Sequence, residues 1–263
     1  MLIDTHCHVQ MRQFASDRDA VIAAAFASGV ERLIVPGIDV DTSKAALELA
    51  ERFPGRIFAG VGTHPHDAST LTSEALREQR AIAQQPGIVA IGEIGLDYFR
   101  DLSPRDIQRH ALIAQLGLAR ELDLPVILHN RESHEDLIAL LRAHGTGVRG
   151  IFHCFIGDRA MAADALDLGF YISFAGPLTY PRNEELRAVA AWAPADRILV
   201  ETDSPYLSPH PLRGKRNEPQ RVTLVARTLA ETRGVTEPEI AELTTRNAAA
   251  AFRLPEPTPK TGA

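Results

Sequence analysis

The stretch that decides the fold stands at the start of the chain, where residues 2–8 read LIDTHCH. Its apolar beginning predicts a short β-strand. Alternate side chains of a strand point to the same face, so His6 and His8 would share one face and could hold one metal ion from the same side. Such a pair is also typical of an ordinary surface turn, so the rest of the chain has to decide. Asp4 and Thr5 are expected to fix this first turn.

Outward from this stretch, short apolar runs alternate with longer helical patterns along nearly the whole chain. The apolar runs predict eight strands, at residues 2–5, 32–35, 57–61, 88–91, 126–128, 150–152, 170–173 and 198–200. The segments between them predict helices at residues 17–28, 41–52, 72–84, 104–122, 132–143, 159–168, 182–193 and 217–233. Eight strand–helix pairs in strict alternation predict an α/β fold with a parallel sheet that closes into a (β/α)8 TIM barrel.

The end of the chain carries one more helical pattern. Residues 236–252 predict an extra C-terminal helix, with Thr236 as its N-cap and Pro238 in its first turn. We expect a single domain over residues 1–254, because one α/β barrel routinely reaches this length. Residues 255–263 are rich in Pro and Thr and are expected to form a disordered tail.

Composition limits the class of protein. The 263 residues are 45% hydrophobic and 24% charged, which is typical of a globular protein with a sizeable core. We find neither a membrane-length apolar run nor a signal peptide, and expect no membrane partner. The only cysteines, Cys7 and Cys154, alternate away from the neighbouring histidines and are expected to pack, so we expect no disulfide-linked partner and a cytoplasmic location. The net charge of −6 argues against non-specific duplex binding but allows one phosphate in a pocket.

Side chains that can bind metal recur where the predicted strands end. They are His6, His8, His64, Glu93, His129, His153 and Asp203. Their separations along the chain fit strand–helix pairs of about 30 residues each. Because the carboxyl ends of all barrel strands meet at one mouth, where barrel enzymes have their active sites, we expect these side chains to converge there.

The predicted ligands exceed the needs of one catalytic ion. Such an ion typically takes three protein ligands and keeps an open position, whereas four imidazoles and two carboxylates are available: His6, His8, Glu93, His129, His153 and Asp203. We therefore expect two divalent ions bridged by Glu93. Mixed nitrogen and oxygen ligands suit Zn²⁺, Mn²⁺, Fe²⁺ or Ni²⁺, and Mg²⁺ where carboxylates and water dominate.

Further residues near the strand ends have predicted roles in catalysis or binding. Asp203 is expected to act as general base for the attacking water as well as ligand. Glu201 lies two residues before Asp203, so its side chain is expected to point to the same face and to orient a metal ligand without binding the metal itself. Arg131 either binds a substrate phosphate through two N–H groups or is a surface arginine that caps its strand. His64 is either a ligand or a contact to the substrate and its leaving group. We favour the latter, which makes the predicted catalytic set Asp203, Glu93 and His64.

Together these motifs resemble the TatD-type metal-dependent deoxyribonucleases of the amidohydrolase superfamily. The resemblance runs from residue 1 to about residue 253, and its most specific motifs are GEIGLDY at 92–98 and ETDSPYL at 201–207. It implies a TIM barrel, a divalent metal centre and phosphodiester hydrolysis. Carried over by position, it implies the same six metal ligands and puts His64, Arg131 and Asn217 in substrate-facing loops.

The sequence also separates branches of that superfamily. Many amidohydrolases bridge their ions with a carboxylated lysine at the end of the fourth strand, where this chain has Glu93. The three lysines, Lys44, Lys215 and Lys260, lie in a helix, a loop and the tail. This favours the glutamate-bridged, nuclease-like branch.

The leading functional hypothesis is a 3′→5′ exonuclease that cuts single-stranded DNA, or RNA, with a metal-activated water. Basic residues after the fourth and eighth strands could hold a nucleic-acid end: Arg100, Arg105, Arg213, Lys215 and Arg216. No stacking run or nucleic-acid module accompanies them. The alternatives are a metal-dependent deacylase or esterase, such as a D-aminoacyl-tRNA deacylase, and a non-catalytic metal-binding barrel. A monomer is the working expectation.

Overall fold

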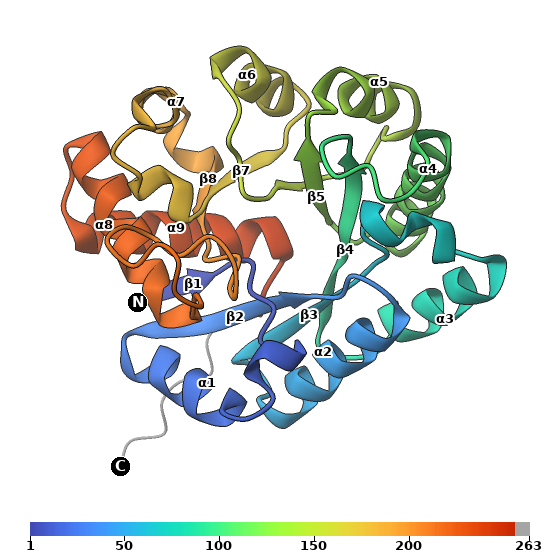
Figure 1. The fold of residues 1–263 in the computed structure, drawn as a ribbon, viewed down its shortest axis with the longest axis horizontal. Helices are drawn as coiled ribbons and strands as arrows, with labels where there is room; N and C mark the ends of the chain where they lie inside the picture. Colours follow the sequence, from blue (N-terminus) through green and yellow to red (C-terminus); the bar gives the residue numbers. More distant parts are fainter. Residues whose placement is uncertain (256–263) are drawn as a thin grey trace.

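The protein, seen here as a computed structural model that describes residues 1–255, is the predicted (β/α)8 barrel with a C-terminal helix (Figure 1). Most of the predicted disordered tail, residues 256–263, lies outside the described residues. Eight parallel strands form one sheet in chain order. They are β1 (Leu2–Asp4), β2 (Val30–Pro36), β3 (Ile57–Val61), β4 (Ile88–Asp97), β5 (Val126–Arg131), β6 (Gly150–Phe152), β7 (Tyr171–Phe174) and β8 (Ile198–Val200).

The barrel closes through the residues that follow β8 and β1. The backbone N–H of Thr5 donates to Val200 O at 3.2 Å, and that of Asp203 donates to His6 O at 2.9 Å. A further bond, from His8 N to Ser204 O, is 2.7 Å long. Closure therefore brings the two ends of the barrel sequence together at the mouth, where His6 and Asp203 become neighbours.

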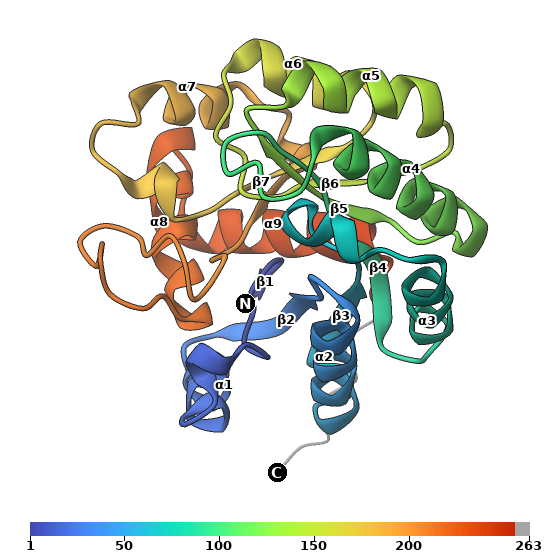
Figure 2. The same ribbon diagram turned by 45° about the vertical axis from the view of Figure 1, so that its right-hand side comes forward.

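Helices cover the outside of the sheet (Figures 1 and 2). They are α1 (Arg18–Ala27), α2 (Val40–Arg52), α3 (Ser73–Ala83), α4 (Arg105–Leu122), α5 (His134–His144), α6 (Arg159–Asp167), α7 (Glu184–Trp192) and α8 (Val222–Arg233). Among residues 1–255, no helix combines the length and the apolar character that crossing a bilayer requires.

The last helix, α9 (Glu237–Phe252), closes the end of the barrel opposite the mouth. Thr236 caps it as predicted, since its side chain accepts from Glu239 N. Asn247 Nδ2 donates to Ile198 O, at the start of β8, at 2.9 Å. Apolar residues of α9, including Phe252, pack in one buried cluster with residues of the inner strand faces such as Ile34.

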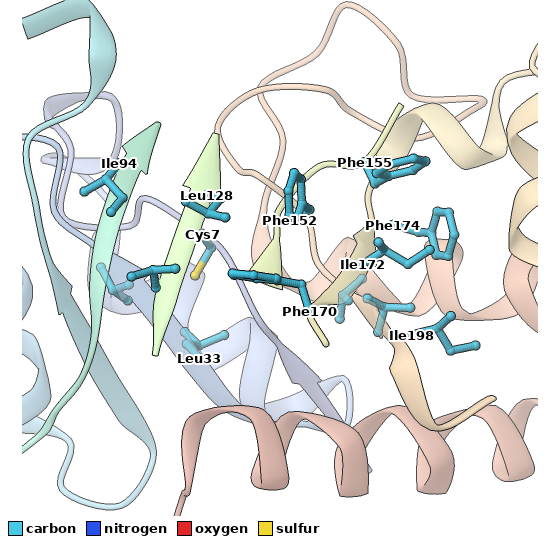
Figure 3. Close-up of a cluster of buried hydrophobic side chains, with 14 of the residues drawn as sticks. Cys7, Leu33, Ile94, Leu128, Phe152, Phe155, Phe170, Ile172, Phe174 and Ile198 are labelled. Atoms are coloured by element: carbon cyan, nitrogen blue, oxygen red, sulfur yellow. The ribbon is translucent and has the colours of Figure 1, made fainter. Parts of the chain in front are cut away.

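The main core lies between the strands and the surrounding helices. All ten residues of β4 are buried, because a parallel strand in a barrel is covered on both faces. Figure 3 shows aromatic side chains of this core: Phe152 packs edge to face against Phe170 at 5.5 Å between ring centres. Cys7 is fully buried in the same cluster, as predicted, and is unpaired, as is Cys154.

Several predicted boundaries are wrong, among them the following three. β1 ends at Asp4, because the residues beyond it pair with the chain after β8 rather than continuing the sheet. β4 runs to Asp97 instead of Ile91, because β5 continues beside it and pairs Asp97 with Arg131. Helix α8 begins at Val222 rather than residue 217, and a short 3₁₀ helix, Pro219–Arg221, precedes it.

Candidate metal centre and substrate pocket

All six predicted ligands meet at the mouth of the barrel. His6 and His8 follow β1, Glu93 lies in β4, His129 lies in β5, His153 follows β6 and Asp203 follows β8. Five of them, all except the fully buried His6, line a cavity of about 500 Å³. Five strands thus contribute to one cluster of nitrogen and oxygen atoms. The His-x-His pair is therefore part of this cluster and not a surface turn.

One group of atoms contains His6 Nε2, His8 Nε2, Glu93 Oε2 and Asp203 Oδ1. The two imidazole nitrogens are 3.0 Å apart, and they lie 3.3 and 3.4 Å from Glu93 Oε2 and 3.8 and 3.7 Å from Asp203 Oδ1. Ligand bonds of about 2.0–2.2 Å put the donor atoms of a tetrahedral ion about 3.4 Å apart. The spacing of this group therefore fits one divalent ion.

A second group surrounds the other oxygen of Glu93. Oε1 lies 2.9 Å from His129 Nδ1, 2.9 Å from His153 Nε2 and 3.2 Å from His64 Nε2. His129 Nδ1 and His153 Nε2 are 3.3 Å apart. These spacings also suit one ion, so Glu93 offers a separate oxygen to each group. The structure places His64 among the potential ligands, although we had favoured a substrate contact.

Burial controls the charge of two imidazoles in this cluster. Burial, together with the neighbouring His153, lowers the pKa of His6 to about 4 against the opposing charge of Glu93. Burial likewise lowers the pKa of His64 to about 4, again against Glu93. At neutral pH both rings are uncharged and keep a lone pair, which is the form that binds metal.

The carboxylates respond differently to the same surroundings. Burial raises the pKa of Asp203 to about 7, although nearby imidazoles oppose the shift. Burial also acts to raise the pKa of Glu93, but the surrounding imidazoles, His153 and His64 foremost, hold that pKa well below its ordinary value. Burial acts to lower the pKa of His153, but Glu93 and Glu201 raise it well above its ordinary value. Glu93 is thus charged, whereas Asp203 can exchange a proton near neutral pH.

Two buried acidic side chains form hydrogen bonds next to the ligand cluster. Glu201 Oε1 accepts from Cys154 N at 2.7 Å and lies 3.2 Å from His153 Nδ1, which is the contact that its predicted orienting role requires. Asp4 accepts from Thr202 Oγ1 at 2.6 Å and from Thr202 N at 2.9 Å. Asp4 therefore joins the end of β1 to the residues that follow β8, two positions before His6.

Asn217, a predicted substrate contact, lies away from the pocket. It is fully buried and does not line the pocket. Its Nδ2 donates to Thr202 O at 2.8 Å, and its backbone N–H donates to Pro205 O at 3.0 Å. These hydrogen bonds fix Asn217 against the loop after β8, so its side chain does not face the pocket.

The predicted basic residues divide into two classes. Arg131 and Arg100 line the pocket, and Arg131 stacks on Phe99 with its Cζ 4.0 Å from the ring centre. Within residues 1–255, Arg131 forms no ion pair. By contrast, Arg216 is paired with Asp17, 2.6 Å away. The arginines that line the pocket therefore lie on the β4 and β5 side of the mouth.

The pocket contains further residues that the sequence did not predict, and two of them contact each other. His66 and Asp97 both line it, and His66 Nε2 lies 2.8 Å from Asp97 Oδ2. The signal for Asp97 was available, because residues 93 and 97 of one strand point to the same face. It was missed because the strand was expected to end at residue 91. Exposed apolar residues form the rim: Leu102, Ile156, Tyr206 and Leu207.

Comparisons with known proteins show the family to which the chain is related. The family model described as TatD related DNase matches residues 3–253. A Bacillus subtilis protein named uncharacterized metal-dependent hydrolase YabD is 44% identical over 255 residues, which cover 97% of this chain and 100% of that protein. The Salmonella typhimurium protein named 3′-5′ ssDNA/RNA exonuclease TatD is 38% identical over 259 residues, covering 96% and 99%.

A solved structure shares the fold over the same span. The crystal structure of YjjV, a TatD homolog from Escherichia coli K12, matches with a TM-score of 0.91 at 33% identity and covers 97% of this chain and 98% of that one. Both the sequence match and the structural match therefore extend over nearly the entire barrel. The chain belongs to the family of TatD-related DNases.

Proposed function

We propose that this protein is a metal-dependent exonuclease that removes nucleotides from the 3′ end of single-stranded DNA or RNA. The proposal rests on the position of Glu93, because its two carboxylate oxygens face two separate groups of ligand atoms. These two groups could hold two divalent ions, which would stabilise the displacement reaction at a phosphodiester. The names of the TatD relatives support the choice of nucleic acid as substrate.

The ligands divide between two ions in this proposal. Glu93 would be shared: with His6, His8 and Asp203 it would hold one ion, and with His129 and His153 it would hold the other. Bound divalent ions activate water and neutralise charge on a phosphoryl group. Catalytic sites keep a coordination position open, and the second group already has three ligands without His64. We therefore assign His64, which also lines the pocket, to the substrate and its leaving group.

Asp203 is the residue that takes the proton of the attacking water. Its side chain is 13% exposed, compared with 4% for Glu93, so it is the carboxylate that water from the pocket can reach. Arg131 binds a phosphate oxygen, since its guanidinium lines the pocket and the Phe99 ring fixes its orientation. The apolar rim then supports the bases, which stack on such surfaces without sequence preference.

The test uses single-stranded DNA and RNA labelled at either the 5′ or the 3′ end, with Mg²⁺ or Mn²⁺. We expect mononucleotides to be released from the 3′ end, with a 3′ label released first and a 5′ label last. Asp203→Asn should abolish release while the exposed control Asp196→Asn should not. Absence of mononucleotide release by the wild-type protein with either metal would contradict the proposal.

The same preparation should be offered D-aminoacyl-tRNA. Ester hydrolysis there, with no cleavage of DNA or RNA, would support the deacylase alternative and overturn the nuclease. Protein that binds divalent ions and is stabilised by them, yet hydrolyses neither nucleic acid nor D-aminoacyl-tRNA, would support the non-catalytic metal-binding barrel. The cytoplasmic location and the monomeric state stay predictions.

A further inference from the structure

A buried carboxylate outside the proposed ligand set connects the metal centre to the substrate side of the pocket. Asp97, the last residue of β4, is 1% exposed. Its Oδ2 lies 3.0 Å from His129 Nε2 and 2.8 Å from His66 Nε2. Its two oxygens are thus surrounded by hydrogen-bonding groups, because Oδ1 also accepts from two backbone N–H groups of the following turn.

The two ring nitrogens of His129 face different groups: Nε2 lies against Asp97 Oδ2, whereas Nδ1 lies 2.9 Å from Glu93 Oε1 and 3.3 Å from His153 Nε2. An ion bound in the second group would take the lone pair of Nδ1, so the remaining ring proton would sit on Nε2, where the carboxylate of Asp97 accepts it. The opposite tautomer would put a proton at the position where an ion is expected to bind.

The other oxygen of Asp97 holds the turn that follows β4. Oδ1 accepts from Phe99 N at 3.0 Å and from Arg100 N at 2.8 Å. Phe99 is the ring on which Arg131 stacks, and Arg100 lines the pocket. One carboxylate therefore contacts both a potential metal ligand and the turn that faces the substrate.

The backbone of Asp97 is itself held in place. Gln108, in α4, accepts from Asp97 N through Oε1 at 2.8 Å and donates from Nε2 to Asp97 O at 3.1 Å. Gln108 and Asp97 are both buried, so bulk water does not compete for either hydrogen bond. The carboxylate thus has a fixed position from which to orient His129.

We propose that Asp97 is a positioning residue: one oxygen sets the tautomer and ring orientation of His129 for metal binding, and the other orders the turn that carries Phe99 and Arg100. The inference rests on the proposed metal-dependent function. Carboxylates that hold the far nitrogen of a metal-binding histidine raise its basicity and fix its ring, and their loss typically costs about 10–100-fold in metal affinity or activity.

The first test reads the tautomer directly in protein loaded with Zn²⁺, which is diamagnetic. Nitrogen-15 NMR of labelled histidines distinguishes a protonated from an unprotonated ring nitrogen, and the His129→Gln variant assigns the signal. We expect His129 to carry its proton on Nε2 in the wild type. A proton on Nδ1 in the neutral ring would overturn the inference. This measurement needs no variant of Asp97, so it holds even if such a variant does not fold.

The second test measures metal affinity. Asparagine at position 97 supplies one acceptor oxygen where four hydrogen bonds arrive, so Asp97→Asn should weaken Mn²⁺ binding about 10–100-fold, with activity partly restored at high Mn²⁺. Asp97→Glu, which keeps both oxygens, should recover part of the affinity. The control is Asp67→Asn, because Asp67 lines the same pocket but its carboxylate has no hydrogen-bond partner within residues 1–255.

The outcomes separate this inference from the proposed function. A wild-type protein that binds no divalent ion would contradict the proposed function itself. Normal binding by the wild type together with equal affinity in Asp97→Asn would contradict only the role of Asp97. A fall in the melting temperature of the metal-free variant without a change in Mn²⁺ affinity would likewise show that Asp97 acts on stability alone, and would overturn the inference.

Discussion

At the scale of single residues, Glu93 directs its two oxygens to different groups of ligand atoms. Glu93→Ala should remove a ligand from both ions and lower kcat by at least about 10³-fold, since bound ions supply several kcal/mol of stabilisation to a phosphoryl-transfer transition state. Elemental analysis should show a loss of bound metal. The exposed Glu48→Gln is a suitable control. Full metal content and full activity in Glu93→Ala would rule out its bridging role.

His64 can be assigned by separating binding from metal content. If it contacts the substrate, His64→Ala should keep both ions and lower kcat/KM by about 10–100-fold, the cost of one hydrogen bond to a charged group. If it is instead a ligand of the second ion, the variant should lose about half of the bound metal. Elemental analysis beside steady-state kinetics therefore decides between the two roles, and loss of metal would contradict our assignment.

At the scale of elements, the contact between β4 and β5 positions His129 and Asp97 together. Gly95 has φ +144°, and a Cβ at this position would lie 2.0 Å from the carbonyl oxygen of His129. The clash is with backbone, so it cannot be relieved by a rotamer change. Gly95→Ala should force the two strands apart, lower the melting temperature and weaken metal binding.

A second glycine provides the control for that variant. Gly117 lies in α4, and a Cβ there would have no heavy atom within 4 Å. Gly117→Ala should raise the free energy of unfolding by up to about 1 kcal/mol, because alanine is the better helix former. Urea denaturation measures both variants. Equal stability and equal Mn²⁺ affinity of Gly95→Ala and the wild type would show that β4 and β5 tolerate separation here.

At the scale of the whole molecule, bound metal would link residues from five strands and thereby stabilise the closed barrel. Ions present at 100 times their dissociation constant add about 2.7 kcal/mol, which corresponds to roughly 5–10 °C in melting temperature for a chain of this size. Chelation should remove this increment, and added Mn²⁺ should restore it. The double variant His6→Ala, His8→Ala lacks half of one ligand group. Its melting temperature should therefore rise less than that of the wild type when Mn²⁺ is added. A melting temperature that chelation leaves unchanged would argue against tight binding.

The strand–helix alternation and the ligand-type residues at the strand ends could be predicted from the sequence for a physical reason. Apolar periodicity is a local property, and a parallel barrel places the carboxyl ends of all strands at one mouth. Once eight alternations are recognised, His6 and Asp203 must be near one another although nearly two hundred residues separate them. Six candidate ligands followed from this rule, and the structure brings all six together.

Other features depend on contacts that no local pattern records. β4 continues past Ile91 because β5 pairs with it, and this extension is what puts Asp97 beside His129. Asn217 looked like a substrate contact, but its burial follows from the path of the loop after β8. The sequence by itself thus determined the barrel and the chemistry gathered at its mouth, because both follow from periodicity. Only the tertiary structure decided which oxygen of Glu93 faces which ligands and which carboxylate orients them, because these depend on how side chains from different strands pack at the mouth of the barrel.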